Sequence, residues 1–372
     1  MCVFFLYLFR MSIMNEYYDN ILTKYNQTIW SYLQWLSNLF YCTNKQEFVW
    51  EDVQQRYLIT PWLWWIINAM EEHKQPYYID QYGYHLRTQL PNGSIKHCYG
   101  YDYGINNASV HRVFDDKIIC WKILYQAWFH TPESFLIISN QSKFSGTINN
   151  RTALEKWLSN KSFPLIVKPI NGSQWEGVHK IMTLEQLQTI VDQLNEWALW
   201  SMYLMIQPLI SGKDIRVIYL DGTIELAYER IPAHIIWNGI HSIQELYLQA
   251  WMQEQQEPIE LYLHAHGINS DSILPSWTHQ QLLPTANIST WGSVKSYHVT
   301  PEDKQFIKHL AKTLDAVYFG ADIITTWSIS EWTIIELNKM PWLSWASRID
   351  PNIMNTIWSN IWKYIQKQSW TQ

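Results

Sequence analysis

Two kinds of hydrophobic spacing alternate along this chain, and together they predict a protein of mixed helices and strands. Apolar residues recur at helical spacing in residues 13–41, 183–197, 242–256 and 300–314, and a closing helix is expected in 351–370. Short apolar runs bounded by turn residues predict strands at 165–167, 203–220, 223–234, 319–324 and 334–338. Residues 257–283 show neither pattern and are expected to be irregular. The mixture before residue 105 suits a small α/β domain.

Polar residues mark the starts of two of these helices. Thr183 and Gln186 make a capping box, and Thr300 is a helix N-cap followed by Pro301 at the first helical position. The apolar stripes behind these starts are predicted to face a core, and they consist of Leu184, Leu187, Val191 and Leu194 in one helix and Phe306, Ile307, Leu310 and Leu314 in the other.

The stretch 163–181 carries the first candidate binding site. A short apolar strand ends in Lys168, and a loop from Gly172 to Gly177 leads into a second strand. Glycine lets backbone N–H groups approach phosphate oxygens, because no Cβ intervenes, and a lysine before such a loop adds positive charge. The order differs from the GxxxxGK[ST] loop, since the lysine precedes the glycines. The stretch predicts a phosphate site, although Trp175 places the largest side chain inside the loop.

Charge and cysteine content restrict the class of protein. The chain has 372 residues and a formal net charge of −6. It has no basic cluster, which argues against nucleic-acid binding. Its four cysteines are scattered and predict a reduced, cytoplasmic protein. The apolar start of the chain is too short to cross a bilayer and lacks the features of a signal peptide, so no membrane association is expected.

Two strands near the end of the chain carry a candidate metal site. Glu336 and Asn338 are two residues apart and therefore share one face of a strand. A hairpin would bring Asp322 beside them. Two carboxylates and an amide oxygen are ligands that suit Mg²⁺, with Mn²⁺ as an alternative. Changing Asp322 or Glu336 to Ala is expected to abolish turnover and spare the fold.

Five sequence blocks in order resemble those of ATP-grasp carboxylate–amine ligases. They are VKPINGSQWEGV in the loop stretch, RIPAHIIWNGIHSIQEL (230–246), ANISTWGSV (286–294), FGADII (319–324) and IIELNKMPWLS (334–344). The resemblance covers roughly residues 105–348. It is nearest to the ATP-grasp domains of cyanophycin synthetase, bifunctional glutathione synthetase and ribosomal-protein glutamate ligases. It implies an α+β ATP-grasp fold, in which two subdomains, at 106–208 and 209–372, clasp ATP behind an N-terminal α/β domain at 1–105.

The resemblance also implies roles for individual residues. Lys117, in an Asp-Lys pair that opens a helix, and Lys168 would contact the nucleotide phosphates, and Arg230 would reach the reacting phosphate. Asn287, with Ser289, matches a loop near the acceptor carboxylate and the metal. Arg216 shares a strand face with Asp214 and would bind a phosphate or carboxylate, although a salt bridge within the sheet would also explain it. The remaining nucleotide contacts would be made by Gly172, Ser173 and Gly177 in the phosphate loop, Gln207, Leu209 and Ile210 around adenine, and Asp214 at the ribose.

The implied reaction forms an amide bond through an acyl phosphate, with ATP and Mg²⁺ as cofactors and small amino acids or peptides as substrates. Self-association into a homo-oligomer is common among such enzymes. Two alternatives stay open at this point. The first is an ATP-grasp kinase, and the second is a binding protein without catalytic activity. A D-alanine–D-alanine ligase fits less well, because the blocks at 230–246 and 286–294 favour the cyanophycin and glutathione group.

Tryptophan occurs where the resembling families have glycine. The chain holds 23 Trp and 13 Gly. A usual glycine content of about 7% would give roughly 26 Gly in a chain of this length. The affected positions include Trp175, Trp237, Trp291, Trp342 and Trp128, and Trp277 and Trp345 also lie in turn-like contexts. We interpret these positions as sites where a UGA codon that encodes glycine has been translated as tryptophan. If the tryptophans are native, Trp175 would obstruct the phosphate loop, and the inactive binding protein becomes the better reading.

Overall fold

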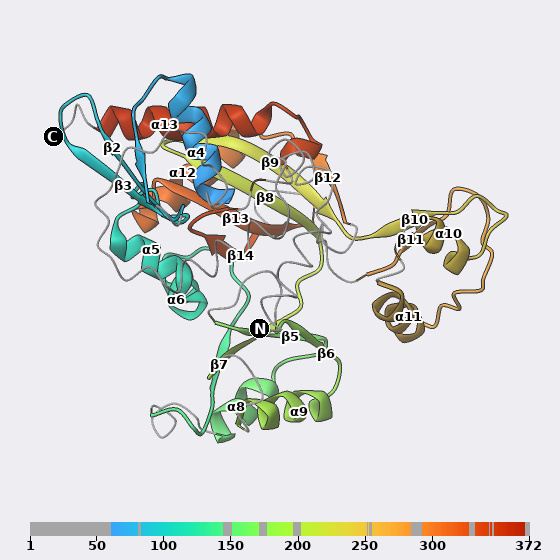
Figure 1. The fold of residues 1–372 in the computed structure, drawn as a ribbon. Helices are drawn as coiled ribbons and strands as arrows, with labels where there is room; N and C mark the ends of the chain where they lie inside the picture. Colours follow the sequence, from blue (N-terminus) through green and yellow to red (C-terminus); the bar gives the residue numbers. More distant parts are fainter. Residues whose placement is uncertain are drawn as a thin grey trace, which may run out of the picture. The chain divides into compact units, whose positions relative to one another are not determined.

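We describe the protein from a computed structural model (Figure 1), which defines residues 61–80, 83–143, 151–170, 177–195, 202–250, 252, 255–283, 292–326, 332–341, 343 and 346–368. The chain divides into two compact units. The first comprises Met1–Tyr103 with Gln366–Gln372, and the second comprises Gly104–Ile365. The helix expected at 13–41 lies outside the described residues. Within the described part of the chain, no helix combines the length and apolarity needed to cross a membrane.

The described part of the first unit holds one helix and a small antiparallel sheet. Helix α4 spans Pro61–Glu72. Strands β1 (Tyr78–Ile79), β2 (His85–Gln89) and β3 (Ile95–Tyr99) form a sheet in that order. A tight turn joins β2 to β3, in which Gly93 takes a φ of 86° and the Asn92 side chain accepts a hydrogen bond from the Ser94 N–H.

A four-stranded antiparallel sheet in the second unit carries the first predicted site. Its order is β4 (Phe135–Ile138), β7 (Tyr203–Pro208), β5 (Leu165–Pro169) and β6 (His179–Ile181). Helices α8 (Arg151–Leu158) and α9 (Leu184–Asn195) lie against one face (Figure 1). That face buries Leu165, Val167, Leu204 and Ile206. Because side chains alternate along a strand, Lys168, Met205 and Gln207 belong to the opposite face.

A five-stranded antiparallel sheet carries the second predicted site. Its order is β12 (Ser293–Ser296), β9 (Thr223–Ile231), β8 (Lys213–Leu220), β13 (Tyr318–Thr325) and β14 (Thr333–Asn338). One face packs in a core with residues of α5 (Ala108–Asp115), α6 (Lys117–Gln126) and α12 (Pro301–Leu314). The members of this core on β8 and β13 are Ile215, Val217, Tyr219, Phe319, Ala321 and Ile323. Their polar neighbours in sequence therefore point to the other face.

An insertion between β9 and β12 has a core of its own. It consists of a two-stranded antiparallel sheet, β10 (His234–Ile236) and β11 (His279–Gln281), with helices α10 (Ile243–Gln249) and α11 (Gln256–Ala265) between the strands in sequence. Two predictions were wrong here. The helix expected at 242–256 ends at Gln249, and the tract expected to be irregular holds α11 and β11. The one-turn spacing of Ile259 and Leu263, both fully buried, is the signal that this tract contains a helix.

The helices predicted at 183–197, 300–314 and 351–370 are present. Helix α12 begins with a capping box, in which the Thr300 side chain accepts from the Asp303 N–H and the Asp303 side chain accepts from the Thr300 N–H. The closing helix is α13 (Ile353–Lys367), flanked by a 3₁₀ turn, η5 (Ala346–Arg348). The predicted stripe of α9 was wrong at one position, because Leu184 is exposed and Ile190 occupies the core in its place.

Candidate active site

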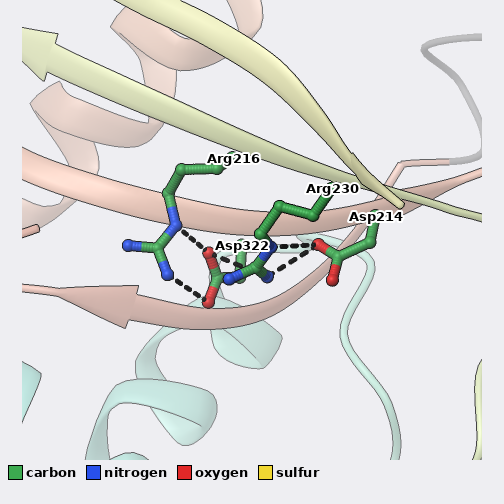
Figure 2. Close-up of polar contacts among 4 residues, drawn as sticks. All are labelled: Asp214, Arg216, Arg230 and Asp322. Atoms are coloured by element: carbon green, nitrogen blue, oxygen red, sulfur yellow. Dashed lines mark hydrogen bonds and ion pairs between the residues drawn. The ribbon is translucent and has the colours of Figure 1, made fainter. Parts of the chain in front are cut away.

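Two arginines and two aspartates form an ion-pair cluster on the polar face of the five-stranded sheet (Figure 2). Arg216 and Asp322 lie directly opposite each other on β8 and β13, and Asp214 and Arg230 do so on β8 and β9. The cluster thus follows from the strand register alone, which places each arginine beside a carboxylate.

The contacts in this cluster are close, and the groups are largely buried. Arg216 Nη2 donates to Asp322 Oδ2 at 3.0 Å, and Arg216 Nε pairs with Asp322 Oδ1. Arg230 Nη2 lies 2.7 Å from Asp214 Oδ1 and 3.3 Å from Asp322 Oδ1. The four side chains expose 9–19% of their surface. Two positive and two negative charges therefore balance each other in a site with little water.

The two aspartates respond differently to this setting. Burial raises the pKa of both carboxyl groups, because it disfavours the charged form. At Asp322 the guanidinium groups of Arg216 and Arg230 outweigh burial, so its pKa lies below the ordinary value. At Asp214 burial prevails, aided by the negative charge of Asp322, and the pKa is raised. Asp322 is thus held as a carboxylate.

Strand β14 brings the other predicted metal ligands to the same face. Glu336 is the register partner of Asp322, and Asn338 follows two residues later opposite Gly320. A register shift lies between this pair and the next one, Ile323–Ile334, so that Ile335 is the additional residue of a β-bulge. The bulge lets Ile334 and Leu337 both enter the core while Glu336 stays on the polar face.

The donor set suits a hard cation. Asp322, Glu336 and Asn338 offer carboxylate and amide oxygens from adjacent strands, which is the chemistry that Mg²⁺ prefers. The Asn338 amide is buried, and its Nδ2 has no hydrogen-bond partner among the described residues. No group of three or more His, Cys, Asp or Glu residues placed for a metal exists within the described ranges. A cation here would therefore need the Asn338 amide oxygen and the phosphates of a bound nucleotide in addition to the two carboxylates.

Lysines from two other elements approach these carboxylates. Lys117, at the first position of α6, has its Nζ 3.5 Å from Glu336 Oε1. Its backbone N–H donates to the Ile170 carbonyl just beyond β5 at 3.3 Å. Lys168, on β5, is buried, and its burial lowers the pKa of its ammonium group, as does the charge of Lys117, whereas Glu336 and Asp322 raise it. The predicted phosphate-binding cations and metal ligands are thus close enough to influence one another.

A pocket lies beside these groups. Its polar lining includes Lys117, Gln207 and Glu336, and its apolar lining includes Phe114, Leu124, Met205 and Ile335. Cys120 also lines it, and burial followed by the charge of Glu336 raises the pKa of the Cys120 thiol to about 12, so the thiol is protonated at neutral pH. An apolar lining with one amide and nearby cations suits a nucleotide base and its phosphates.

Several predicted site residues do not line the pocket, and others lie outside the described residues. Leu209 and Ile210 follow β7, and the residues that line the pocket do not include them. Gly177 precedes β6 with a φ of 70°, and a Cβ there would lie 2.9 Å from the Pro169 ring. This close approach requires glycine. Gly172, Ser173 and Asn287 lie outside the described residues, as do Trp175, Trp291, Trp342 and Trp345.

Three residues of the site escaped the sequence analysis. Met205 lines the pocket beside Gln207, and their two-residue spacing on one strand was the available signal. Ser134 binds the Gln207 side chain at 2.7 Å. Cys120 faces the pocket from α6, one turn after Lys117, at the i+3 spacing that places both on one side of a helix.

Trp128 has a backbone conformation that favours glycine. Its φ is 65°. It follows α6 in a Schellman motif, since the Phe129 N–H donates to the Leu124 carbonyl at 3.0 Å and the Trp128 N–H donates to the Tyr125 carbonyl at 3.1 Å. The residue at this position is usually glycine. The Trp128 side chain is 92% exposed and therefore gains little from packing.

Trp277 has the same kind of conformation, whereas Trp237 does not. Trp277 has a φ of 69°, is 81% exposed, and is the third residue of a turn closed by the Thr278 N–H on the Pro275 carbonyl. A positive φ at this turn position favours glycine. Trp237 is instead buried in the core of the insertion, and its indole N–H has no partner among the described residues.

The two sheets and their connections define an ATP-grasp fold. A bifunctional glutathione synthetase from Pasteurella multocida has a similar structure, with a TM-score of 0.50, 17% sequence identity, and coverage of 80% of this chain and 43% of that one. Residues 114–234 match the RimK-like ATP-grasp domain. This match confirms the resemblance to ATP-grasp ligases that the five blocks predicted.

Curated proteins of two kinds are also similar to this chain. Cyanophycin synthetase from Trichormus variabilis is 26% identical over 268 residues, which cover 64% of this chain and 29% of the relative. The glutathione biosynthesis bifunctional protein of Listeria welshimeri is 26% identical over 208 residues, which cover 51% of this chain and 27% of the relative. This chain thus spans less than a third of the length of these relatives.

Proposed function

We propose that this chain is a ligase that uses ATP and Mg²⁺ to join the carboxylate of a small amino acid or peptide to an amine. The observation that carries the proposal is the convergence of Lys117, Lys168 and Glu336 beside the pocket that Gln207 lines. Cations and carboxylates gathered at the edge of an apolar pocket fit a metal–nucleotide complex. The family match supports the same reading.

The pocket would bind the adenine, and the two lysines would bind the phosphates. Met205 and Ile335 provide apolar walls, and Gln207 provides the polar contact that orients the base. Lys168 stands on β5 immediately before the predicted phosphate loop. Its burial makes its charge costly unless an anion is nearby. A bound triphosphate would supply that anion.

Asp322, Glu336 and Asn338 would hold the Mg²⁺. When bound, Mg²⁺ would neutralise charge on the phosphoryl group that is transferred. Asp322 already receives three hydrogen bonds or ion pairs from Arg216 and Arg230. Because a carboxylate has about four lone-pair sites, one direction at Asp322 stays open to a cation.

Arg216 and Arg230 would orient the substrate that provides the carboxylate. Arg216 and Arg230 each carry five donors in a rigid fork, and the contacts to the aspartates fix both guanidinium planes. Their remaining N–H groups can bind a substrate carboxylate or the γ-phosphate. Asn287 is proposed to contact the acceptor from its loop.

Two displacements would then complete the reaction. A substrate carboxylate oxygen bonds to the γ-phosphorus, the bond from that phosphorus to the β–γ bridging oxygen breaks, and ADP leaves. The amine nitrogen next attacks the acyl carbon and loses a proton, and inorganic phosphate departs with the amide formed. Fixed cations around the phosphoryl group lower the barrier, because they stabilise charge that develops there.

Trapping with hydroxylamine tests this chemistry. The full chain would be incubated with ATP, Mg²⁺ and pooled amino acids or dipeptides, and both ADP and acyl hydroxamates would be measured. The proposal expects hydroxamate that depends on ATP and on a carboxylate substrate. A phosphorylated product that resists hydroxylamine would instead identify a kinase. A chain that binds ATP but forms neither product with any pool would contradict the ligase assignment.

A further inference from the structure

A chain of hydrogen bonds fixes the amide of Gln207 at the pocket. Gln207 and Ser134 are both buried, exposing 3% and 8% of their surface. Gln207 Nε2 donates to Ser134 Oγ at 2.7 Å, and Ser134 Oγ donates to the Pro132 carbonyl at 3.0 Å. The register explains the first contact, since Phe135 pairs with Ile206 and the adjacent residues Ser134 and Gln207 are therefore neighbours across β4 and β7.

The direction of these bonds follows from the number of available protons. A serine hydroxyl has one proton, and the Ser134 proton is used on the Pro132 carbonyl. Ser134 Oγ can therefore only accept from Gln207. If the amide turned over, its oxygen would face a second acceptor in a buried place, which is unfavourable. The Gln207 amide oxygen is thus left as an acceptor for whatever occupies the pocket.

We propose that Ser134 is a positioning residue that selects the purine: by locking the Gln207 amide, it makes the pocket prefer a base with an amino group at position 6 over one with a carbonyl group there. This inference rests on the proposed nucleotide site. A 6-amino group donates to the Gln207 oxygen, whereas a 6-carbonyl group would place two acceptors against each other. Thr131 also lines the pocket, and its buried hydroxyl has no partner in the described part of the chain. It does not discriminate between the two bases, because a hydroxyl can donate to a carbonyl group or accept from an amino group.

The test compares ATP with inosine triphosphate, which carries a carbonyl group at position 6. Their dissociation constants would be measured with Mg²⁺ by isothermal titration calorimetry on the full chain. For the wild type we expect ATP to bind about 10- to 100-fold more tightly, as a buried mismatch of acceptors implies. Ser134→Ala frees the amide to turn over, and the preference should fall by about tenfold. Ser134→Thr keeps the hydroxyl and should keep the preference.

Two further variants separate positioning from a general effect on the fold. Gln207→Glu offers an acceptor in either orientation and should retain a preference for ATP. Ser139→Ala removes another buried serine hydroxyl, which donates to the Leu194 carbonyl at 3.2 Å. Ser139 does not line the pocket, so this variant should leave the ratio of the two dissociation constants unchanged.

The outcomes distinguish the inference from the function beneath it. A wild type that binds neither nucleotide would overturn the nucleotide site and this inference with it. A wild type that prefers ATP, with a Ser134→Ala variant that weakens both nucleotides equally, would overturn the positioning role alone. If Ser134→Ala fails to fold, by circular dichroism, Ser134→Cys replaces the hydroxyl with a weaker hydrogen-bonding group and should lower the same ratio; an unchanged ratio in that variant would also overturn the role.

Discussion

Arg216 and Asp322 face each other across β8 and β13, and the same Asp322 carboxylate also pairs with Arg230. One residue thus serves two purposes. It forms ion pairs with two buried guanidinium groups, and it is a proposed metal ligand. The consequence is that Asp322 contributes to the fold as well as to the site.

Asp322→Asn is therefore expected to destabilise the protein by about 3–5 kcal/mol, the usual cost of removing one partner from a buried ion pair. This differs from the expectation based on the sequence, in which replacing Asp322 spares the fold. Urea unfolding measures the change. Glu133→Gln is the matched control, because Glu133 pairs with Lys161 at 2.6 Å while exposing 54% of its side chain, and it should cost about 1 kcal/mol or less. Equal costs for the two variants would contradict the buried-cluster argument.

Glu336→Ala is the cleaner test of the metal site. Its side chain is 27% exposed, and its ion pair with Lys117 is 3.5 Å long, so the fold should lose only about 1 kcal/mol. We expect the Mg²⁺ dependence of ATP affinity to weaken strongly, because one of two carboxylate ligands is lost. ATP titrations at several Mg²⁺ concentrations measure this. Glu302→Ala, on the exposed first turn of α12, serves as the control, and a matching Mg²⁺ dependence in both variants would argue against the proposed ligand.

ATP binding is expected to take up protons at alkaline pH through Lys168. Burial lowers the pKa of this lysine in the free protein, and a bound triphosphate would raise it by stabilising the ammonium form. Between the two pKa values, binding adds a proton, and ATP affinity falls as the pH rises through the lower value. Calorimetry above about pH 8, where ATP itself is fully ionised, in buffers of different ionisation enthalpy, measures the uptake. Lys168→Arg should bind ATP without it, since arginine stays protonated. Equal uptake in both proteins would assign the proton to another group.

The sequence predicted the parts of this site that depend on strand periodicity. Glu336 and Asn338 share a face, and Asp322 lies beside Glu336, as the two-residue spacing and the expected hairpin required. The pairing of Arg216 was one of two readings from the sequence, because a polar strand residue does not reveal its cross-strand partner until the register is known. The register joined it to Asp322 rather than to a residue of its own strand.

Other features depended on distant contacts and could not be predicted. The bulge at Ile335 resets the alternation of β14, so that Ile334 and Leu337 both enter the core, and a strict period of two would have placed one of them outside. Ser134 reaches Gln207 only because β4 and β7 pair across 73 positions of sequence. Single-sequence periodicity contains no information on such pairings.

Trp277→Gly is expected to stabilise the protein slightly. A positive φ at the third position of its turn costs about 1–2 kcal/mol for a residue with a Cβ, and an 81% exposed indole returns little of that cost. Thermal unfolding measures the change. Trp237→Gly is the contrast, because that side chain is 1% exposed in the core of the insertion, and its removal should cost about 3–5 kcal/mol. A Trp277→Gly variant that loses stability to a similar degree would show that the indole has a packing role.

Trp128→Gly should also raise the free energy of unfolding, by about 1 kcal/mol, because glycine removes the Cβ strain of the left-handed position while it adds entropy to the unfolded chain. The prediction is specific to glycine. Trp128→Ala removes the same exposed indole but keeps a Cβ at a φ of 65°, and it should change stability by less than about 0.5 kcal/mol. A gain with glycine and none with alanine would support the interpretation that glycine is native at this helix end. Equal effects would attribute any change to the indole itself, and a loss with both would show that tryptophan belongs at this position.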